Sequence, residues 1–331
     1  MRAIVQDQYG PPEALALREV EEPAVGDDGV LVSVRAASVN ALDWHYVRGT
    51  PYVMRLQTGL RKPSTPIRGN DLAGRVEAVG PDVSTVQPGD EVFGGTNGTF
   101  ADYVVTREGN LAHKPAALSS LEAAAVPTAG VTALQGLRKV GALEPGESVL
   151  INGASGGVGT FAVQLASSMG ARVAGVSSSR NVELVESIGA QDVIDYTATD
   201  FTRLDRRYDL VFDLVGNRSL RELRRVLRPD GTLVLGGGAG GRWIGPLGTT
   251  VIAMVASRFV TQEYRPFLAR LNAADLEELA GLIDAGQVTP VIDRTYPLEE
   301  VPAAIEYVET GRARGKVLID VEGGLEQGKP S

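Results

Sequence analysis

Short apolar runs alternate with helix-like patterns through the middle of the chain. Five of these runs are expected to be buried strands, at residues 149–151, 172–176, 193–194, 210–215 and 232–235. After the first run, apolar residues recur three and four positions apart, as on the buried face of a helix: Val158, Phe161, Ala162, Leu165, Ala166 and Met169. Strands that alternate with helices at this spacing predict an α/β fold with a doubly wound parallel sheet. Ligands of such sheets bind beyond the carboxyl ends of the strands.

Neighbouring patterns extend this sheet domain. Asn181 is expected to cap the helix that follows it, and residues 220–227 predict a helix that ends at a turn over 229–231. A sixth strand is expected within 259–267. The helix after it has Leu276, Leu279, Ala280 and Ile283 on one face.

The first 120 residues have a different pattern. Short strand-like runs at 73–79, 91–94 and 100–105 are separated by Pro-Asp, Pro-Gly-Asp and Asn-Gly turns. They predict a compact β-barrel-like domain. An alanine-rich stretch, 118–137, is expected to form a helical bridge to the sheet domain, and residues 316–321 a strand that returns to the first domain.

The loop after the first sheet strand carries the main chemical signal. It reads Ala154-Ser155-Gly156-Gly157-Val158-Gly159, with alanine in the first position of a glycine fingerprint. Glycines let the backbone approach a pyrophosphate, and the start of a helix offers unpaired N–H groups to it. A tight turn without a ligand is the alternative, but the ordered strands and helices that follow favour a dinucleotide-binding (Rossmann) domain.

The residues expected beside the cofactor's ribose favour NADPH. An NAD site usually has Asp or Glu about twenty residues after the glycines. Here the window reads Val-Ser-Ser-Ser-Arg-Asn at 176–181, and the first acid, Glu183, is already in the next helix. Hydroxyls and the Arg180 guanidinium suit a 2′-phosphate. A polar loop with a solvated arginine is the alternative.

Composition excludes several classes of function. A net charge of −9 and a pI near 5.0 argue against nucleic acid and anionic membrane surfaces as partners. The absence of cysteine excludes disulfides, thiol nucleophiles and cysteine-ligated zinc, and fits a cytoplasmic location. Residues 1–5 already alternate like a strand, so no signal peptide is expected. The longest apolar run, 249–255, is too short to span a bilayer and predicts a buried helix.

Several motifs in this order resemble the medium-chain dehydrogenase/reductase superfamily, and most of all its zinc-independent quinone-oxidoreductase branch. They are NDLAGRVEAVG at 70–80, PGDEVF at 88–93, VNALDW at 39–44, AQDVIDY at 190–196 and ARGKV at 313–317, together with the glycine loop. The resemblance covers nearly the whole chain. It implies a GroES-like catalytic domain from residues 1–123 and 268–331, an NADPH-binding Rossmann domain at 124–267, and a cleft where the two meet.

The chain also departs from the zinc-dependent members of this superfamily. They have Gly-His-Glu where this chain has Gly69-Asn70-Asp71, and they use cysteines at their metal sites. The only histidines, His45 and His113, are far apart in sequence, so we predict that no metal is bound. Without a Lewis acid to ionise an alcohol, hydride transfer to an electrophilic quinone or α,β-unsaturated carbonyl is favoured.

The resemblance also suggests site residues. On the loop after the central strand of the first domain, Asp43, His45 and Tyr46 are the catalytic candidates, with His45 or Tyr46 placed to bond a substrate oxygen or pass a proton. A purely structural role for His45 is the alternative. Tyr52 and Trp243 are candidates to line the substrate pocket, although core packing explains each equally well.

The predicted cofactor contacts come from both domains. Asn40 is expected near the nicotinamide ribose, Tyr196 beside the adenosine and Lys316 near the 2′-phosphate. The full set is Asn40, Thr132, Ser155, Gly156, Gly157, Val158, Ser177, Ser178, Arg180, Tyr196, Val215, Gly236, Gly237 and Lys316.

Two functions of different classes follow from these residues. The first is an NADPH-dependent reductase of quinones or activated alkenes, which takes a small-molecule substrate and has a homodimer as its candidate assembly. The second is an NADPH-binding sensor or scaffold with little turnover, since this branch has no indispensable catalytic residue to check.

Overall fold

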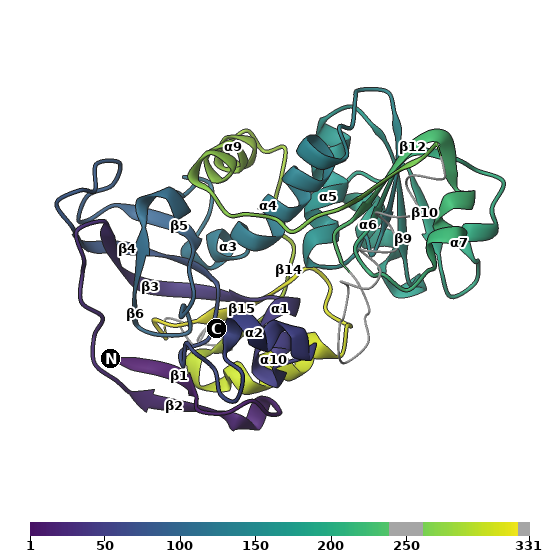
Figure 1. Ribbon diagram of the computed structural model, residues 1–331. Coiled ribbons are helices and arrows are strands. Elements are labelled where there is room, and N and C mark those ends of the chain that lie inside the picture. Colours follow the sequence, from purple (N-terminus) through teal and green to yellow (C-terminus); the bar gives the residue numbers. More distant parts are fainter. Residues whose placement is uncertain (238–260, 324–331) are drawn as a thin grey trace, which may run out of the picture.

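The computed structural model describes residues 1–237 and 261–323, which form two lobes (Figure 1). One lobe is built around a mainly antiparallel sheet and contains both the first third of the chain and its last described strand. The other lobe is built around a parallel sheet from the middle of the chain. This is the predicted combination of a GroES-like domain and a Rossmann-like domain.

The first lobe has seven strands in its main sheet. Its strand order is β14-β15-β3-β4-β5-β7, and β6 pairs with the first half of β3. These strands are β3 (Gly29–Val39), β4 (Asp71–Val79), β5 (Glu91–Gly95), β6 (Tyr103–Arg107), β7 (Leu111–His113), β14 (Ile292–Pro297) and β15 (Lys316–Asp320). A two-stranded sheet of β1 (Arg2–Gln6) and β2 (Leu15–Glu19) lies beside them. The predicted return of the chain end is confirmed, because β15 pairs antiparallel with β3.

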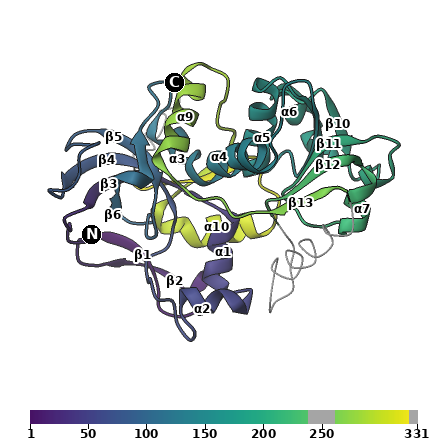
Figure 2. The same ribbon diagram turned by 45° about the horizontal axis from the view of Figure 1, so that its top comes forward.

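The helices of this lobe are α1 (Ala41–Arg48), α2 (Arg55–Thr58), α3 (Ser120–Ala124) and α10 (Val301–Glu309). Helix α1 lies against α10, and α2 lies close to α1 in both views (Figure 2). The core contains Val32, Leu72, Phe100, Ile305 and Ile319 among others, and so joins residues from both ends of the chain.

The second lobe has six parallel strands in the order β10-β9-β8-β11-β12-β13. They are β8 (Ser148–Asn152), β9 (Arg172–Ser177), β10 (Asp192–Asp195), β11 (Tyr208–Asp213), β12 (Leu227–Leu235) and β13 (Glu263–Pro266). One face packs on α4 (Pro127–Leu134), α5 (Gly157–Ser168) and α6 (Val182–Ser187), and the other on α7 (Leu220–Arg225). Helix α9 (Ala273–Asp284) lies against α4 and β7, between the lobes. Helices on both faces make the sheet doubly wound, as predicted.

Several details differ from the sequence predictions. The turn expected at 229–231 lies inside β12, where the register with β11 shifts and the extra residues bulge out. The bridge at 118–137 is two helices, α3 and α4, because Pro127 begins a new helix at its first position. The strand predicted at 100–105 runs over Tyr103–Arg107 instead. Residues 238–260, with the predicted helix at 249–255, lie outside the described residues.

Several elements carry no sequence prediction, among them β2, α2, β7, β14 and α10. In the part of the chain that the structure describes, no helix is long and apolar enough to cross a membrane.

Candidate active site

The glycine loop between β8 and α5 is shaped for close approach of an anion. Gly156 is the N-cap residue of α5, with extended backbone and no side-chain cap, so the first N–H groups of the helix have no side-chain acceptor. A Cβ atom on Gly159 would lie 2.1 Å from the Gly153 carbonyl oxygen, so only glycine fits there. At Gly156 a Cβ would meet only that same oxygen, at 3.4 Å. Space therefore remains in front of the loop, as a pyrophosphate requires, and the residues fit a dinucleotide.

The loop is held by contacts from two other segments. The carbonyl of Ser155 accepts a hydrogen bond from the Gly315 N–H at 2.9 Å, which ties the loop to the end of the chain. The Ser155 hydroxyl accepts a bond from the Asn181 side chain at 2.9 Å. Asn181 is the N-cap residue of α6 but makes no side-chain cap, contrary to the sequence prediction. Its amide nitrogen is turned to the loop, and its Oδ1 has no hydrogen-bond partner among the described residues.

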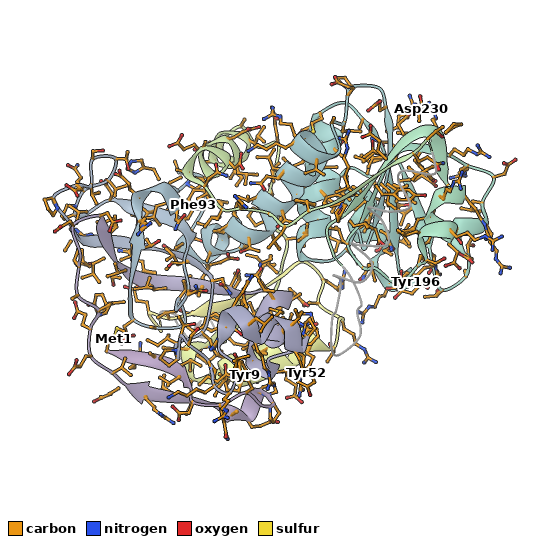
Figure 3. All side chains as sticks on the ribbon, in the orientation of Figure 1. Met1, Tyr9, Tyr52, Phe93, Tyr196 and Asp230 are labelled. Carbon is orange, nitrogen blue, oxygen red and sulfur yellow. The ribbon has the colours of Figure 1, made fainter. Side chains whose placement is uncertain are left out.

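The carboxyl end of β9 carries hydroxyls and a guanidinium. Ser177 ends the strand and accepts the Tyr196 N–H at 3.0 Å, so Tyr196, which is 53% exposed, lies beside it on the sheet lobe (Figure 3). Arg180 follows and donates to the carbonyl of Arg312 at 2.9 Å. Arg312 belongs to the turn between α10 and β15, and no sequence pattern had pointed to it. The backbone of the turn between α10 and β15 is thus tied to this end of the strand.

The nearest acid at this edge comes from the next strand. Asp195 ends β10, and its carboxylate accepts hydrogen bonds from the hydroxyls of Ser179 and Thr197, at 2.7 Å each. These bonds lower the pKa of Asp195. Its oxygens are thus engaged by neighbouring hydroxyls, and β9 itself ends without an acid.

A buried ion cluster lies where the two lobes meet, and it consists of Asn40, Asp43, Asp71, Thr128 and Lys316. Asp71 has no exposed surface, and its two carboxylate oxygens accept four hydrogen bonds. The donors are the Ser38 hydroxyl, the Asn40 amide, and both the N–H and hydroxyl of Thr128. Because Thr128 is in the first turn of α4, the carboxylate also caps that helix.

Lys316 belongs to this cluster and not to the end of β9. Its side chain is 3% exposed, and its ammonium donates to Asn40 Oδ1 at 2.5 Å and lies 3.5 Å from Asp71 Oδ2. Burial lowers the pKa of Lys316, and the charge of Asp71 opposes that shift. The expected position of Lys316 at the 2′-phosphate is therefore corrected, because its charge is engaged inside the protein. Its stem lies beside the glycine loop, with Cδ 3.1 Å from where a Cβ on Gly157 would be.

Asp43 lies on helix α1 and not on a loop as expected. It accepts the Asn40 N–H at 2.7 Å and the Asn70 amide at 2.6 Å, so it completes a capping box at the start of the helix. Burial raises its pKa to about 7, while the bond from the Asn40 N–H opposes the shift. With both oxygens engaged, Asp43 is placed to position Asn40.

The other two catalytic candidates, one turn later on α1, differ in what they bond. His45 bonds the Thr50 carbonyl through Nδ1 at 2.8 Å and stacks on Trp44, and burial lowers its pKa. Tyr46 is half-buried, which raises its pKa, and its hydroxyl makes no hydrogen bond to a described residue. Of the two, Tyr46 has the hydroxyl that remains available.

Arg68 is a functional candidate that the sequence analysis missed. Its side chain is 6% exposed, donates from Nη2 to the Thr65 carbonyl at 2.6 Å, and leaves Nε without a partner among the described residues. Asp43 and Tyr46 are near enough to act on its charge. A buried guanidinium beside two candidate residues offers donors for a substrate oxygen. Its only sequence signal is a charge just before a buried strand.

The remaining predicted site residues lie outside the ion cluster, the glycine loop and the end of β9. Thr132 donates to the Thr128 carbonyl within α4. Val215 is partly exposed just after β11, while Gly236 and Gly237 follow β12 and pack closely on Phe212 and Leu214. Tyr52 lies under the Arg55 guanidinium. Trp243 lies outside the described residues.

Two surface cavities, of about 350 and 550 Å³, are lined by none of the predicted site residues. Across residues 1–237 and 261–323, no group of three or more His, Asp or Glu side chains is arranged to hold a metal ion.

A Rossmann-like sheet with this loop, joined to a GroES-like lobe, defines a two-lobe dinucleotide-binding protein. Residues 26–116 match the family described as alcohol dehydrogenase GroES-like domain, and residues 188–319 match the zinc-binding dehydrogenase family. A 2-methylene-furan-3-one reductase from Solanum lycopersicum is 34% identical over 96% of this chain and 79% of that protein.

Solved structures agree with the sequence comparisons. The quinone oxidoreductase from Coxiella burnetii has a TM-score of 0.86 and 31% identity over 97% of this chain and 99% of its own. The Escherichia coli quinone oxidoreductase complexed with NADPH has a TM-score of 0.84 and 26% identity over 97% and 100%. The chain therefore belongs to the medium-chain dehydrogenase/reductase superfamily of oxidoreductases, in its quinone-oxidoreductase-like branch.

Proposed function

We propose that this protein is an NADPH-dependent, zinc-independent reductase that transfers hydride to a quinone or to an α,β-unsaturated carbonyl. The names of the relatives support this substrate class, since they describe a quinone oxidoreductase and a reductase of a methylene ketone. The bound NADPH of the Escherichia coli protein supports a nicotinamide cofactor. A cytoplasmic location and a homodimer remain predictions.

The end of β9 is the observation that carries the preference for NADPH. An acid there would bond a 2′-hydroxyl and repel a 2′-phosphate. The strand ends instead in Ser177, followed by Ser178 and Arg180, and Arg180 is bonded to the backbone of Arg312. The Arg180 guanidinium suits the charge and geometry of a phosphate.

The ion cluster provides the other end of the cofactor site. The Asn40 side chain accepts from Lys316 and donates to Asp71, so it has one fixed orientation, and Asp43 holds its backbone N–H. A reduced nicotinamide supplies the hydride when bound. The protein's part is to orient the acceptor and to stabilise the negative charge that develops on its oxygen. Tyr46 and Arg68 have the unused donors for that oxygen, and solvent supplies the proton.

Replacing Arg180 with Ala tests the cofactor assignment. The variant should bind NADPH about 10- to 100-fold more weakly, the effect of losing one charged hydrogen bond, whereas NADH binding should hardly change. Binding is measured by fluorescence titration. Arg203, which is exposed and paired with Asp200, gives the control substitution. Equal weakening of both cofactors would make Arg180 a structural residue.

Turnover separates the reductase from the sensor or scaffold. We expect steady NADPH oxidation with quinones, enones or enals. Tight NADPH binding without turnover over that panel would favour the sensor, and so the two functions give opposite results in one assay.

A further inference from the structure

Arginines gather in one part of the sheet lobe. Eight lie between residues 203 and 228, in a chain whose net charge is −9. Four of them have carboxylate partners: Arg203 and Arg218 with Asp200, Arg206 with Asp192, and Arg228 with Asp209. The other four, Arg207, Arg221, Arg224 and Arg225, have no carboxylate partner in the described part of the chain.

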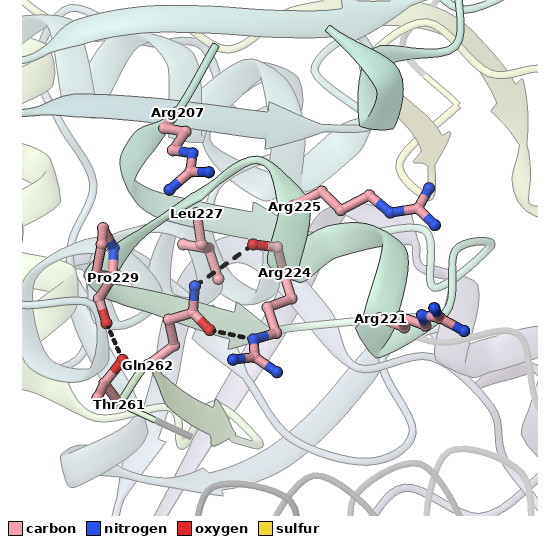
Figure 4. Close-up of a pocket in the computed structure, with 8 residues that line it drawn as sticks. All are labelled: Arg207, Arg221, Arg224, Arg225, Leu227, Pro229, Thr261 and Gln262. Atoms are coloured by element: carbon pink, nitrogen blue, oxygen red, sulfur yellow. Dashed lines mark hydrogen bonds between the residues drawn. The ribbon is translucent and has the colours of Figure 1, made fainter. Parts of the chain in front are cut away.

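These four arginines line the same cavity. It has a volume of about 350 Å³, and Leu227, Pro229, Thr261 and Gln262 complete its lining (Figure 4). Arg224 donates to the Gln262 side-chain oxygen at 2.8 Å, and Gln262 in turn donates to the Arg228 carbonyl at 3.1 Å. In Figure 4, Arg207 lies on one side of this pair, and Arg221 and Arg225 lie on the other. The lining contains no acid, so its charge is uncompensated.

Helix stability does not account for the whole cluster. Arg224 and Arg225 are in the last turn of α7, where the helix dipole favours a cation. Arg221 is in the first turn of the same helix, where the dipole disfavours one. Arg207 precedes β11 and belongs to no helix. Two of the four charges therefore have no structural explanation.

The cavity and the proposed cofactor site lie at opposite ends of the strands of the parallel sheet. Leu227 begins β12, and Gln262 directly precedes β13, so the cavity is at the amino ends of these strands. The glycine loop and Ser177 follow the carboxyl ends of β8 and β9 in the same parallel sheet. A ligand in this cavity would not overlap a dinucleotide at the other edge.

We propose that this cavity binds a small molecule that carries a chain of phosphates. The planar guanidinium pairs with phosphate oxygens through two parallel hydrogen bonds, and four guanidiniums without a carboxylate partner need several negative charges at once. The volume lies in the range of small-molecule sites, about 300–1,000 Å³. A nucleoside triphosphate and inorganic polyphosphate share this chemistry.

Calorimetric titration of the NADPH-saturated protein tests the site, with inorganic tripolyphosphate and ATP as probes. We expect one equivalent to bind. Arg224→Gln should weaken binding about 10- to 100-fold, and Arg224→Lys by less, because the charge remains. Arg228→Gln is the matched control, since Arg228 is paired with Asp209 outside the cavity, and it should leave affinity nearly unchanged.

Each outcome bears on the proposal. Tighter binding of ATP indicates a nucleotide, and equal binding of both probes indicates polyphosphate. No saturable binding at millimolar concentration would overturn the site, as would equal weakening by Arg228→Gln, which would indicate only a general positive field. The same titration of the NADPH-free protein is the comparison, and binding seen only there would assign the phosphates to the cofactor site and overturn the proposal. If Arg224→Gln fails to fold, Arg207→Gln, outside the helix, replaces it.

Discussion

Replacing Lys316 with Met removes the only cation of the buried ion cluster and keeps the volume of its side chain. Asp71 would then keep its hydrogen bonds but lose the ammonium 3.5 Å away. Removing one partner of a buried pair costs about 3–5 kcal/mol of folding free energy, because the remaining charge is uncompensated. We expect a loss of that size at pH 8, measured by urea unfolding.

The loss should depend on pH. The Asp43 pKa is raised to about 7 from its usual 3.8, so the folded protein binds this proton more tightly than the unfolded chain does. The resulting gain in folding free energy is complete below about pH 4 and is lost as the pH rises through 7. Lys316 holds that pKa down, so the variant should lose stability more steeply over this range. The lowered pKa of Lys316 also makes the difference between the two proteins smaller at low pH. The native protein has to bury a charged ammonium there, and the Met variant does not. The difference between the two proteins should therefore be smaller at pH 5 than at pH 8.

Lys139→Met is the matched control for this experiment. Lys139 contacts Asp275 at 2.6 Å, but its side chain is 53% exposed, so its loss should cost about 1 kcal/mol or less. The Asp275 pKa is lowered, so this smaller loss should be the same at pH 5 and pH 8. A Lys316→Met loss that is no larger than the control's, or that is equal at both pH values, would refute the account of the ion cluster.

Three further predictions concern the chemistry. His45→Ala and Tyr46→Phe should each slow turnover by less than the 10²–10⁴-fold typical of a lost general acid, because solvent supplies the proton. A folded His45→Ala variant that binds NADPH normally but whose turnover falls by more than this range would identify His45 as the general acid. Gly156→Val should fold, as its Cβ has room, yet fail to bind NADPH in a fluorescence titration, whereas Gly159→Val should not fold. Dialysis against a strong chelator should leave activity intact, and stoichiometric zinc whose removal abolishes turnover would contradict the assignment.

Local patterns predicted the elements of the sheet lobe well. The strands other than β13 combine buried apolar residues with a nearby glycine or polar turn, and that pattern needs no tertiary information. Helix α10 was not predicted from the sequence. Val301, Ala304 and Ile305 have helical spacing and are buried, but Pro302 reads as a breaker, although proline is favourable in the first turn of a helix. The turn at 229–231 failed for the opposite reason, since a bulge in a strand uses the same residues as a turn.

The candidate site divides in the same way. The glycine loop and the end of β9 are contiguous in sequence, so their chemistry can be read directly. The ion cluster cannot be predicted from local sequence, because Lys316 and Asn40 are 276 residues apart and meet only when β15 pairs with β3. Nothing near Lys316 in the sequence indicates a buried amide partner. From the sequence alone, a lysine in that position is therefore expected to contact a phosphate.

The pairing of β15 with β3 also explains how the two halves of the site are held together. Gly315 donates its N–H to the carbonyl of Ser155 in the glycine loop, and the next residue, Lys316, donates its ammonium to Asn40. Two adjacent residues thus contact the loop of one lobe and the start of α1 in the other. Gly315 has a positive φ of 84°, and a Cβ there would lie 2.2 Å from the Val291 carbonyl oxygen, so this segment has little freedom to shift. The distance between the glycine loop and Asn40 is therefore set by two adjacent residues, and under the proposed function this segment fixes the separation of the two ends of the cofactor site.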